Sequence, residues 1–194
     1  MKIVGLTGGI GMGKSTAANA FRRARIPVYD ADADVHRMYV KNGRAVRPID
    51  EAFPGTVVDG AVDRARLRPV LQQPENLRRL EAIVHPLVRD EVFRFIARAR
   101  RQGARAVVID NPLLIEMGMA DEVDLVLVVS APPAVQVHRV LRRGRMTPDQ
   151  VRAVIARQMP DAEKRRRADI VVRTGLSRNQ TLRQLRPLIR NLRS

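Results

Sequence analysis

A glycine-rich segment near the start of the chain constrains its fold more than any other feature. Residues 8 to 15 read Gly-Gly-Ile-Gly-Met-Gly-Lys-Ser, which fits the phosphate-binding P-loop pattern G-x-x-x-x-G-K-S/T. Glycines let the backbone fold into a nest of inward-pointing N–H groups, since any Cβ would block the approach of a phosphate. The N-terminus of the following helix adds partial positive charge. We expect Lys14 to reach the β- and γ-phosphates and the Ser15 hydroxyl to ligate Mg²⁺.

The residues on either side of this loop fit the same interpretation. Lys2 to Thr7 form a short apolar run that suits a buried parallel strand, and Ser15 to Arg25 have helix-forming composition. Strand, glycine loop and helix are the setting that a P-loop requires, whereas a plain Gly-rich turn is the structural alternative. The positions expected to bind a nucleotide are Gly8, Gly9, Gly11, Met12, Gly13, Lys14, Ser15 and Thr16.

Size and composition restrict the class of protein. The 194 residues, 45% of them apolar, can bury a core, and we expect one globular unit with subdomains. The sequence contains no cysteine, which excludes disulfides and thiolate metal sites. No apolar run reaches the ~18 residues of a membrane helix, and the chain starts directly with the strand, so we expect a cytoplasmic protein without membrane contact.

The formal net charge of +16 raises the question of nucleic-acid binding. Almost all of the excess is arginine, and only Lys2, Lys14, Lys41 and Lys164 are lysines. Aromatic residues make up 3% of the chain, which leaves no stacking platform for single strands. We therefore expect the charge to favour polyanionic small molecules such as nucleotides, with no obligatory nucleic-acid partner.

Five short, β-branched-rich runs predict an α/β fold with a central parallel sheet. Helical patterns separate these runs, which cover residues Ile3 to Thr7, Pro27 to Asp30, Ala106 to Asp110, Leu125 to Ser130 and Ile170 to Arg173.

Two segments between these runs are too long for simple crossovers. Residues 33–103 show one brief strand-like run, Thr56 to Val58, and apolar residues at helical spacing, with Pro86 placed to start a new helix. We expect this insertion to bind substrate and the arginine-rich residues 139–167 to form a lid. The core then comprises about 1–32, 104–138 and 168–194, and Ser177 to Arg193 form a helix on the sheet.

Carboxylates follow two of the predicted strands, at the edge where ligands of such sheets bind. Asp30 and Asp34 are interpreted as helix caps, whereas Asp32 could orient an acceptor hydroxyl and take its proton, as kinases require. Asp110 resembles a Walker B position that supports Mg²⁺ through water, although it could simply cap the strand before Pro112.

Arginines cluster after the fourth predicted strand. Arg139, Arg142 and Arg143 share a helix face by their spacing, and Arg145 follows them. Kinases use lid arginines to neutralise the transferred phosphoryl group, while most charge runs are solvated faces. We expect at least one of these arginines to act in catalysis.

Taken together, these motifs resemble those of the dephospho-CoA kinase family over nearly the whole chain. The resemblance rests on the order and spacing of Val4 to Gly11, Asp30 to Asp32, His85 to Arg89, Pro112 to Glu116, Arg139, Arg143, Gln158 and Ala168 to Val171. It implies a P-loop kinase with a nucleoside-monophosphate-kinase-like core, a helical CoA domain and a lid, which uses ATP and Mg²⁺.

The resemblance also assigns roles to residues. It implies that Asp32 is the catalytic base and that Arg139 and Arg143 act from the lid together with Lys14 of the P-loop. The acceptor, dephospho-CoA, would lie near Asp32, His85, Pro86, Arg89, Pro112, Leu113, Leu114 and Glu116. Two positions depart from the family pattern. Met12 stands where Ser is usual, and Arg173 to Gly175 replace an Asn-containing turn, which leaves the adenine contacts open.

The expected activity is phosphorylation of the ribose 3′-hydroxyl of dephospho-CoA by a monomer or weak homo-oligomer. A kinase for a nucleoside monophosphate or another small molecule shares the core, but the insertion around His85 and Pro86 argues against it. An ATP-dependent nucleic-acid-binding protein is the alternative from another class.

Overall fold

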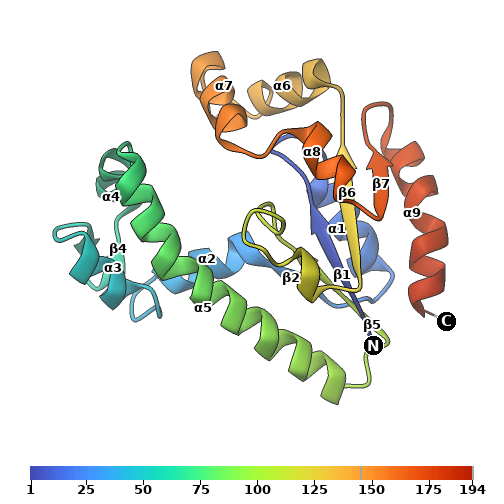
Figure 1. Ribbon diagram of the computed structural model, residues 1–194, viewed down its shortest axis with the longest axis horizontal. Helices are drawn as coiled ribbons and strands as arrows, with labels where there is room; N and C mark the ends of the chain where they lie inside the picture. The colour runs from blue at the N-terminus through green and yellow to red at the C-terminus, as the bar shows by residue number, and fades with distance from the viewer. Residues whose placement is uncertain (145, 194) are drawn as a thin grey trace. The chain divides into compact units, whose positions relative to one another are not determined.

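A five-stranded parallel sheet organises most of the chain (Figure 1). Its strands are β1 (Lys2–Thr7), β2 (Val28–Asp30), β5 (Ala106–Asp110), β6 (Leu125–Ser130) and β7 (Ile170–Arg173), in the order β2-β5-β1-β6-β7. The five predicted runs are thereby confirmed as strands. Because β1 is central and the chain order reverses beside it, the loop after β1 occupies the position where ligands bind in sheets of this kind.

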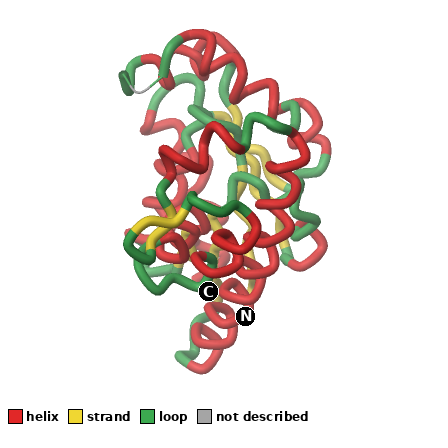
Figure 2. The backbone as a smooth tube through the Cα atoms, turned by 90° about the vertical axis from the view of Figure 1, so that its left-hand side faces the viewer, coloured by secondary structure: helices red, strands yellow, loops and turns green. Residues whose placement is uncertain are grey.

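Residues 1–144 and 146–193 are described in this computed structural model, and the chain divides into two compact units. The first unit comprises Met1–Tyr29 and Arg98–Ser194, and the second comprises Asp30–Ala97. The first unit contains the helices α1 (Lys14–Arg23), α6 (Pro133–Leu141), α7 (Pro148–Arg157), α8 (Asp161–Arg166) and α9 (Arg178–Arg193) and the 3₁₀ turn η1 (Ala120–Glu122). Figure 2 shows the helices of the chain in red and the strands in yellow.

Helices α1 and α9 pack together over one face of the sheet. Phe21 of α1 and Leu185 of α9 are fully buried in a cluster with Val4, Leu127 and other inward-facing strand residues. Removal of this apolar surface from water is the main force that holds the helices on the sheet. The apolar stripe predicted for the C-terminal helix is confirmed, since Leu182, Leu188 and Ile189 pack against the same cluster.

On the opposite face, the loop after β5 lies directly on β1. A Cβ on Gly5 would lie 2.4 Å from Cδ2 of Leu114, a separation that atoms cannot reach without displacement. Glycine at this position therefore allows the fully buried Leu114 side chain to pack onto the strand. This contact between Leu114 and Gly5 holds the loop after β5 close to β1.

The second unit is mainly helical, with α2 (Ala31–Tyr39), α3 (Val46–Ala52), α4 (Arg64–Val70) and the long α5 (Pro74–Arg101), whose last turn belongs to the first unit. A short antiparallel pair joins α3 to α4 and consists of β3 (Val57–Val58) and β4 (Ala61–Val62). The predicted strand-like run contains β3, whereas β4 was not predicted, because two residues are too few for an alternating pattern.

Pro86 does not start a helix, as the sequence suggested, but lies inside α5. Proline removes one helical hydrogen bond and clashes with the carbonyl four residues earlier. The apolar stripe continues through this point, however, because Leu80, Val84, Val88, Val92 and Ile96 follow one another at intervals of four and are all buried. Burial of this long stripe offsets the local loss, so a single helix forms.

Across residues 1–144 and 146–193, no helix combines the length and the apolar character that crossing a membrane demands.

Candidate functional site

The P-loop connects the buried end of β1 to the first turn of α1. Gly13 is the residue before α1 and has φ 95°, in the left-handed region where glycine is favoured. A Cβ there would also lie 3.0 Å from Oγ1 of Thr174, so the loop could not approach the turn after β7 as closely. The amide of Thr16 donates to the Gly13 carbonyl at 3.0 Å, which starts the helix whose N-terminus faces the loop.

Two glutamines hold the peptide groups of Ile10 from both sides. Nε2 of Gln136, on α6, donates to the Ile10 carbonyl at 2.9 Å. Oε1 of Gln158, the residue after α7, accepts from the Ile10 amide at 2.9 Å. The tip of the P-loop is therefore fixed by residues that lie more than a hundred positions further along the chain.

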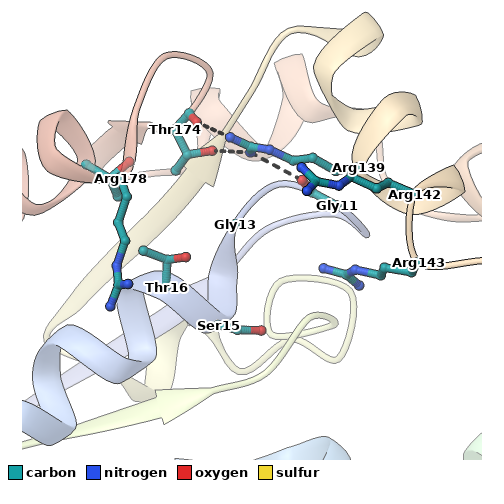
Figure 3. Close-up of a pocket in the computed structure, with 10 residues that line it drawn as sticks. Gly11, Gly13, Ser15, Thr16, Arg139, Arg142, Arg143, Thr174 and Arg178 are labelled. Atoms are coloured by element: carbon teal, nitrogen blue, oxygen red, sulfur yellow. Dashed lines mark hydrogen bonds between the residues drawn. The ribbon is translucent and has the colours of Figure 1, made fainter.

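Thr174, directly after β7, supports the other end of the loop. Its hydroxyl donates to the Met12 carbonyl at 2.6 Å, and its carbonyl and hydroxyl oxygens both accept from the Arg139 guanidinium. Arg139 also reaches the Gly11 carbonyl at 3.5 Å (Figure 3). The side chain of Met12 is buried, and its sulfur accepts from the Ala131 amide at 3.0 Å. Met12 is thus anchored away from the phosphate-binding face.

A cavity of about 400 Å³ opens beside the P-loop (Figure 3). In the view of Figure 3, Arg178 lies on one side of the Gly13–Thr16 turn and Arg143 on the other. Among the described residues that line the cavity, four are arginines and none is acidic. The lining consists of Gly11, Gly13, Ser15, Thr16, Arg139, Arg142, Arg143, Thr174, Arg178 and Thr181. Backbone N–H groups, a helix N-terminus and clustered guanidinium groups suit a polyphosphate.

The predicted helix face of arginines needs a correction. Helix α6 ends at Leu141, so Arg139 lies in its last turn while Arg142 and Arg143 follow it in the turn that Gly144 closes with φ 66°. All three nevertheless line the cavity. Arg145 lies outside the described residues.

Lys14 and Asp110 form an ion pair at the carboxyl edge of the sheet. Nζ of Lys14 lies 2.6 Å from Oδ1 of Asp110, which ends β5 and is 3% exposed. The carboxylate predicted for metal support thus holds the ammonium predicted for phosphate binding. Within the described residues, no group of three or more His, Cys, Asp or Glu side chains could cage a metal ion. Ser15, at the start of α1, is exposed to the cavity.

The loop from Pro112 to Glu116 follows β5 and Asn111. Oδ1 of Asn111 accepts from the Leu113 amide at 2.9 Å, which fixes the turn. Since the Leu114 side chain is buried, only its backbone remains for the substrate contact that the resemblance implies. Glu116 is paired with Lys164 of α8 at 2.7 Å.

The predicted acceptor residues of the second unit lie on two helices. Asp30 is the N-cap of α2 and accepts from the Ala33 amide at 3.0 Å, as predicted. Asp34 is not a cap, because it lies within the helix, is 4% exposed and pairs with Arg37 at 2.7 Å. Asp32, in the first turn, is exposed and so available to a ligand.

On α5, His85 is half-buried, and Pro86 and Arg89 are exposed within the next turn. Burial lowers the pKa of His85 from its ordinary value, and the nearby Glu81 carboxylate opposes part of this shift. His85 is therefore held toward its neutral form, in which one ring nitrogen can accept a hydrogen bond.

Sequence reasoning missed several residues of the site. Gln136 and Arg178 carry no motif, and Thr174 was noted only as part of a turn that departs from the family pattern. Their roles come from contacts across distant parts of the chain. Gln158 was noted only for its match to the family pattern. Lys164 had one available signal, since it is one of only four lysines in a chain whose basic residues are otherwise arginine.

Comparisons with known proteins agree with this geometry. The family model described as dephospho-CoA kinase matches residues 2–179. A dephospho-CoA kinase from Rhodopseudomonas palustris (strain HaA2) is 50% identical over 190 residues, which cover 97% of this chain and 94% of that protein.

Solved structures extend the comparison to the fold. A protein from Thermus thermophilus superimposes with a TM-score of 0.84 at 36% identity, covering 98% of this chain and 97% of the other. The dephospho-CoA kinase from Campylobacter jejuni gives a TM-score of 0.73 at 20% identity, with 99% and 98% covered, and so supports the fold alone.

Proposed function

The chain belongs to the dephospho-CoA kinase family, and we propose that it transfers the γ-phosphoryl group of ATP to the ribose 3′-hydroxyl of dephospho-CoA. The single observation that carries the nucleotide half of this proposal is the arginine-lined cavity beside the P-loop. The acceptor half rests on the family, and on Asp32, His85 and Arg89, which the second unit supplies.

Lys14 is proposed to exchange partners when ATP binds. Its ammonium lies against Asp110 at 2.6 Å, and a triphosphate in the P-loop would offer it a stronger anion. The donor set also fits Mg²⁺, which prefers one or two protein oxygens together with water and phosphate oxygens. Ser15 would be the direct ligand and Asp110 a contact through water. The metal would supply positive charge that neutralises phosphate oxygens of the nucleotide.

Arg139 and Arg143 are proposed to have different roles in the reaction. The Arg139 guanidinium is already engaged by Thr174 and Gly11, so it orders the loop around the nucleotide. Arg143 lines the cavity, and none of the described residues forms an ion pair or hydrogen bond with its guanidinium. Arg142 and Arg178 line the same cavity, and the family resemblance is what favours Arg143 as the arginine that neutralises charge developing on the transferred group.

The acceptor hydroxyl requires a base or at least an orienting carboxylate. Asp32 is the proposed residue, since it is exposed at the start of α2 whereas Asp30 and Asp34 are occupied as a cap and an ion pair. In a loose phosphoryl-transfer transition state, this carboxylate orients the hydroxyl as much as it removes the proton.

The test is ADP release by the purified protein with Mg²⁺, ATP and each of four acceptors: dephospho-CoA, AMP, shikimate and gluconate. We expect dephospho-CoA to give the highest kcat/KM and the 3′-phosphorylated product. Faster turnover of AMP or a sugar acid would reject the proposed acceptor. Retention of RNA on a filter at moderate salt, without dephospho-CoA turnover, would favour the nucleic-acid alternative. A cytoplasmic location and a monomeric or weakly oligomeric state stay predictions.

A further inference from the structure

Helix α8 is fixed to the sheet at its start. Ser130, the last residue of β6, donates to Oδ2 of Asp161 at 2.8 Å, and the helix packs along β6 (Figure 1). Pro160 precedes the helix, and the amide of Met159, the residue before it, donates to Oε1 of Glu116 at 3.4 Å. Side chains on α8 are therefore carried by a rigid support.

The most buried charge on this helix is Lys164, which is 1% exposed. Its ammonium donates to the Pro112 carbonyl at 2.8 Å and lies 2.7 Å from Oε1 of Glu116. Desolvation of an ammonium group is costly, and only good geometry with an opposite charge and further acceptors offsets it. Both partners of Lys164 belong to one five-residue loop, so this buried charge is committed to the loop from Pro112 to Glu116.

The loop also has contacts that do not involve Lys164. At its far end, the Met117 amide donates to the Leu113 carbonyl at 2.8 Å, and the Met159 amide donates to Oε1 of Glu116 at 3.4 Å. The Pro112 carbonyl also accepts from the hydroxyl of Thr7, the residue before the P-loop, at 3.1 Å. Asn111 holds Leu113, and Leu114 is packed on Gly5. Glu116, with 22% of its side chain exposed, is the end of the loop nearest solvent, and its carboxylate is held from α8.

We propose that Lys164 is a positioning residue that holds the Pro112–Glu116 loop in its acceptor-binding shape, and that Glu116 acts through Lys164 rather than on the substrate. This inference rests on the proposed function, in which the loop contacts dephospho-CoA. It predicts that loss of Lys164 lowers kcat/KM for dephospho-CoA while the affinity for ATP stays nearly unchanged.

The experiment compares Lys164→Met, Glu116→Gln and the double variant with wild type. Arg167→Met is the matched control, because Arg167 follows the same helix and pairs with Glu163 on the surface. Steady-state kinetics give KM for each substrate, and titration calorimetry gives the affinity for Mg-ATP. Hydrogen exchange of the peptide that covers residues 112–117 reports the order of the loop without any substrate.

We expect Lys164→Met to lower kcat/KM for dephospho-CoA roughly ten- to hundredfold, the effect of losing hydrogen bonds to a charged group. The affinity for Mg-ATP stays within about twofold, and exchange in the loop accelerates relative to Arg167→Met. Adding Glu116→Gln to Lys164→Met changes kcat/KM for dephospho-CoA little further, because both substitutions break the same ion pair between Lys164 and Glu116.

Equal losses for ATP and acceptor, or a lower melting temperature with unchanged acceptor kinetics and loop exchange, would overturn the inference. Additive losses for Lys164→Met and Glu116→Gln would place Glu116 on the substrate instead. If Lys164→Met does not fold, the milder Glu116→Gln must still accelerate loop exchange and weaken acceptor use. If wild type does not use dephospho-CoA, the proposed function fails, while loop exchange still decides whether Lys164 positions the loop.

Discussion

At the scale of single residues, Lys14 contacts the buried carboxylate of Asp110. Lys14→Ala removes the ammonium group expected to bind the phosphates, and with it the ion pair to the buried Asp110 carboxylate. We expect turnover to fall at least ~100-fold and the melting temperature to drop by several degrees, because removing one member of a buried ion pair is destabilising. Assays of kcat together with thermal melts measure both effects.

The double variant Lys14→Ala/Asp110→Asn separates these two effects. It should regain part of the lost melting temperature, since the remaining side chain is neutral, yet stay inactive. Near-normal activity of Lys14→Ala would contradict the P-loop assignment.

The three carboxylates at the start of α2 have different surroundings and should respond differently. We expect Asp32→Asn to lower kcat by ~10²–10⁴-fold, with little change in stability, because the side chain is exposed. Asp30→Ala removes a helix cap and should cost about 1 kcal/mol of stability with a smaller effect on kcat. Asp34→Asn should lower stability as well, by loss of the Arg37 pair. If Asp32→Asn retains most of its kcat, Asp110 becomes the next candidate for the base.

His85 gives the stability of the protein a pH dependence of known sign. Its folded pKa lies below the ordinary value of 6.5, chiefly because of burial. Well above about pH 6.5, His85 is neutral in both the folded and the unfolded chain. As the pH decreases, His85 of the unfolded chain is protonated before His85 of the folded protein, so the free energy of unfolding falls. Urea unfolding at about pH 7.5 and 5.5 should show a smaller difference for His85→Gln than for wild type. Equal differences would show that His85 is not the group responsible.

At the scale of elements, the end of α6 at Leu141 gives Arg139 and Arg143 different surroundings. Arg139 stays in the helix and is tied to Thr174, while Arg143 follows the helix and extends into the cavity. We expect Arg143→Ala to lower kcat more than it raises KM for ATP, and Arg139→Ala to raise KM for ATP and to lower the melting temperature. A pure KM effect of Arg143→Ala would make it a contact of the ground state.

The elements also show what the sequence could predict and what it could not. All five sheet strands and the C-terminal helix were predicted, because buried parallel strands and amphipathic helices leave strong local patterns. The uninterrupted α5 was not predicted, since Pro86 is a local signal and the stripe that overrides it is longer. The Gln136, Thr174 and Lys164 contacts join segments far apart in the sequence, and no local pattern encodes them.

At the scale of the whole molecule, the net charge of +16 affects the encounter with anionic substrates. We expect KM for ATP to rise several-fold as NaCl increases from ~0.05 to ~0.5 M, because the Debye length shortens to a few ångströms. The value of kcat should change little, since contacts that are shielded from solvent are screened less. A KM that is independent of salt would show that the surface charge does not assist binding.

The double hold on Ile10 also decides when the phosphate loop becomes ordered. Because Gln136 and Gln158 fix the peptide groups on both sides of this residue, the conformational entropy of the loop is lost during folding and not during ligand binding. The loop is therefore already ordered when a nucleotide binds, and calorimetry should show a less favourable entropy of binding when Gln136→Ala removes one of these contacts. The two glutamines thus order the loop during folding, before any ligand binds.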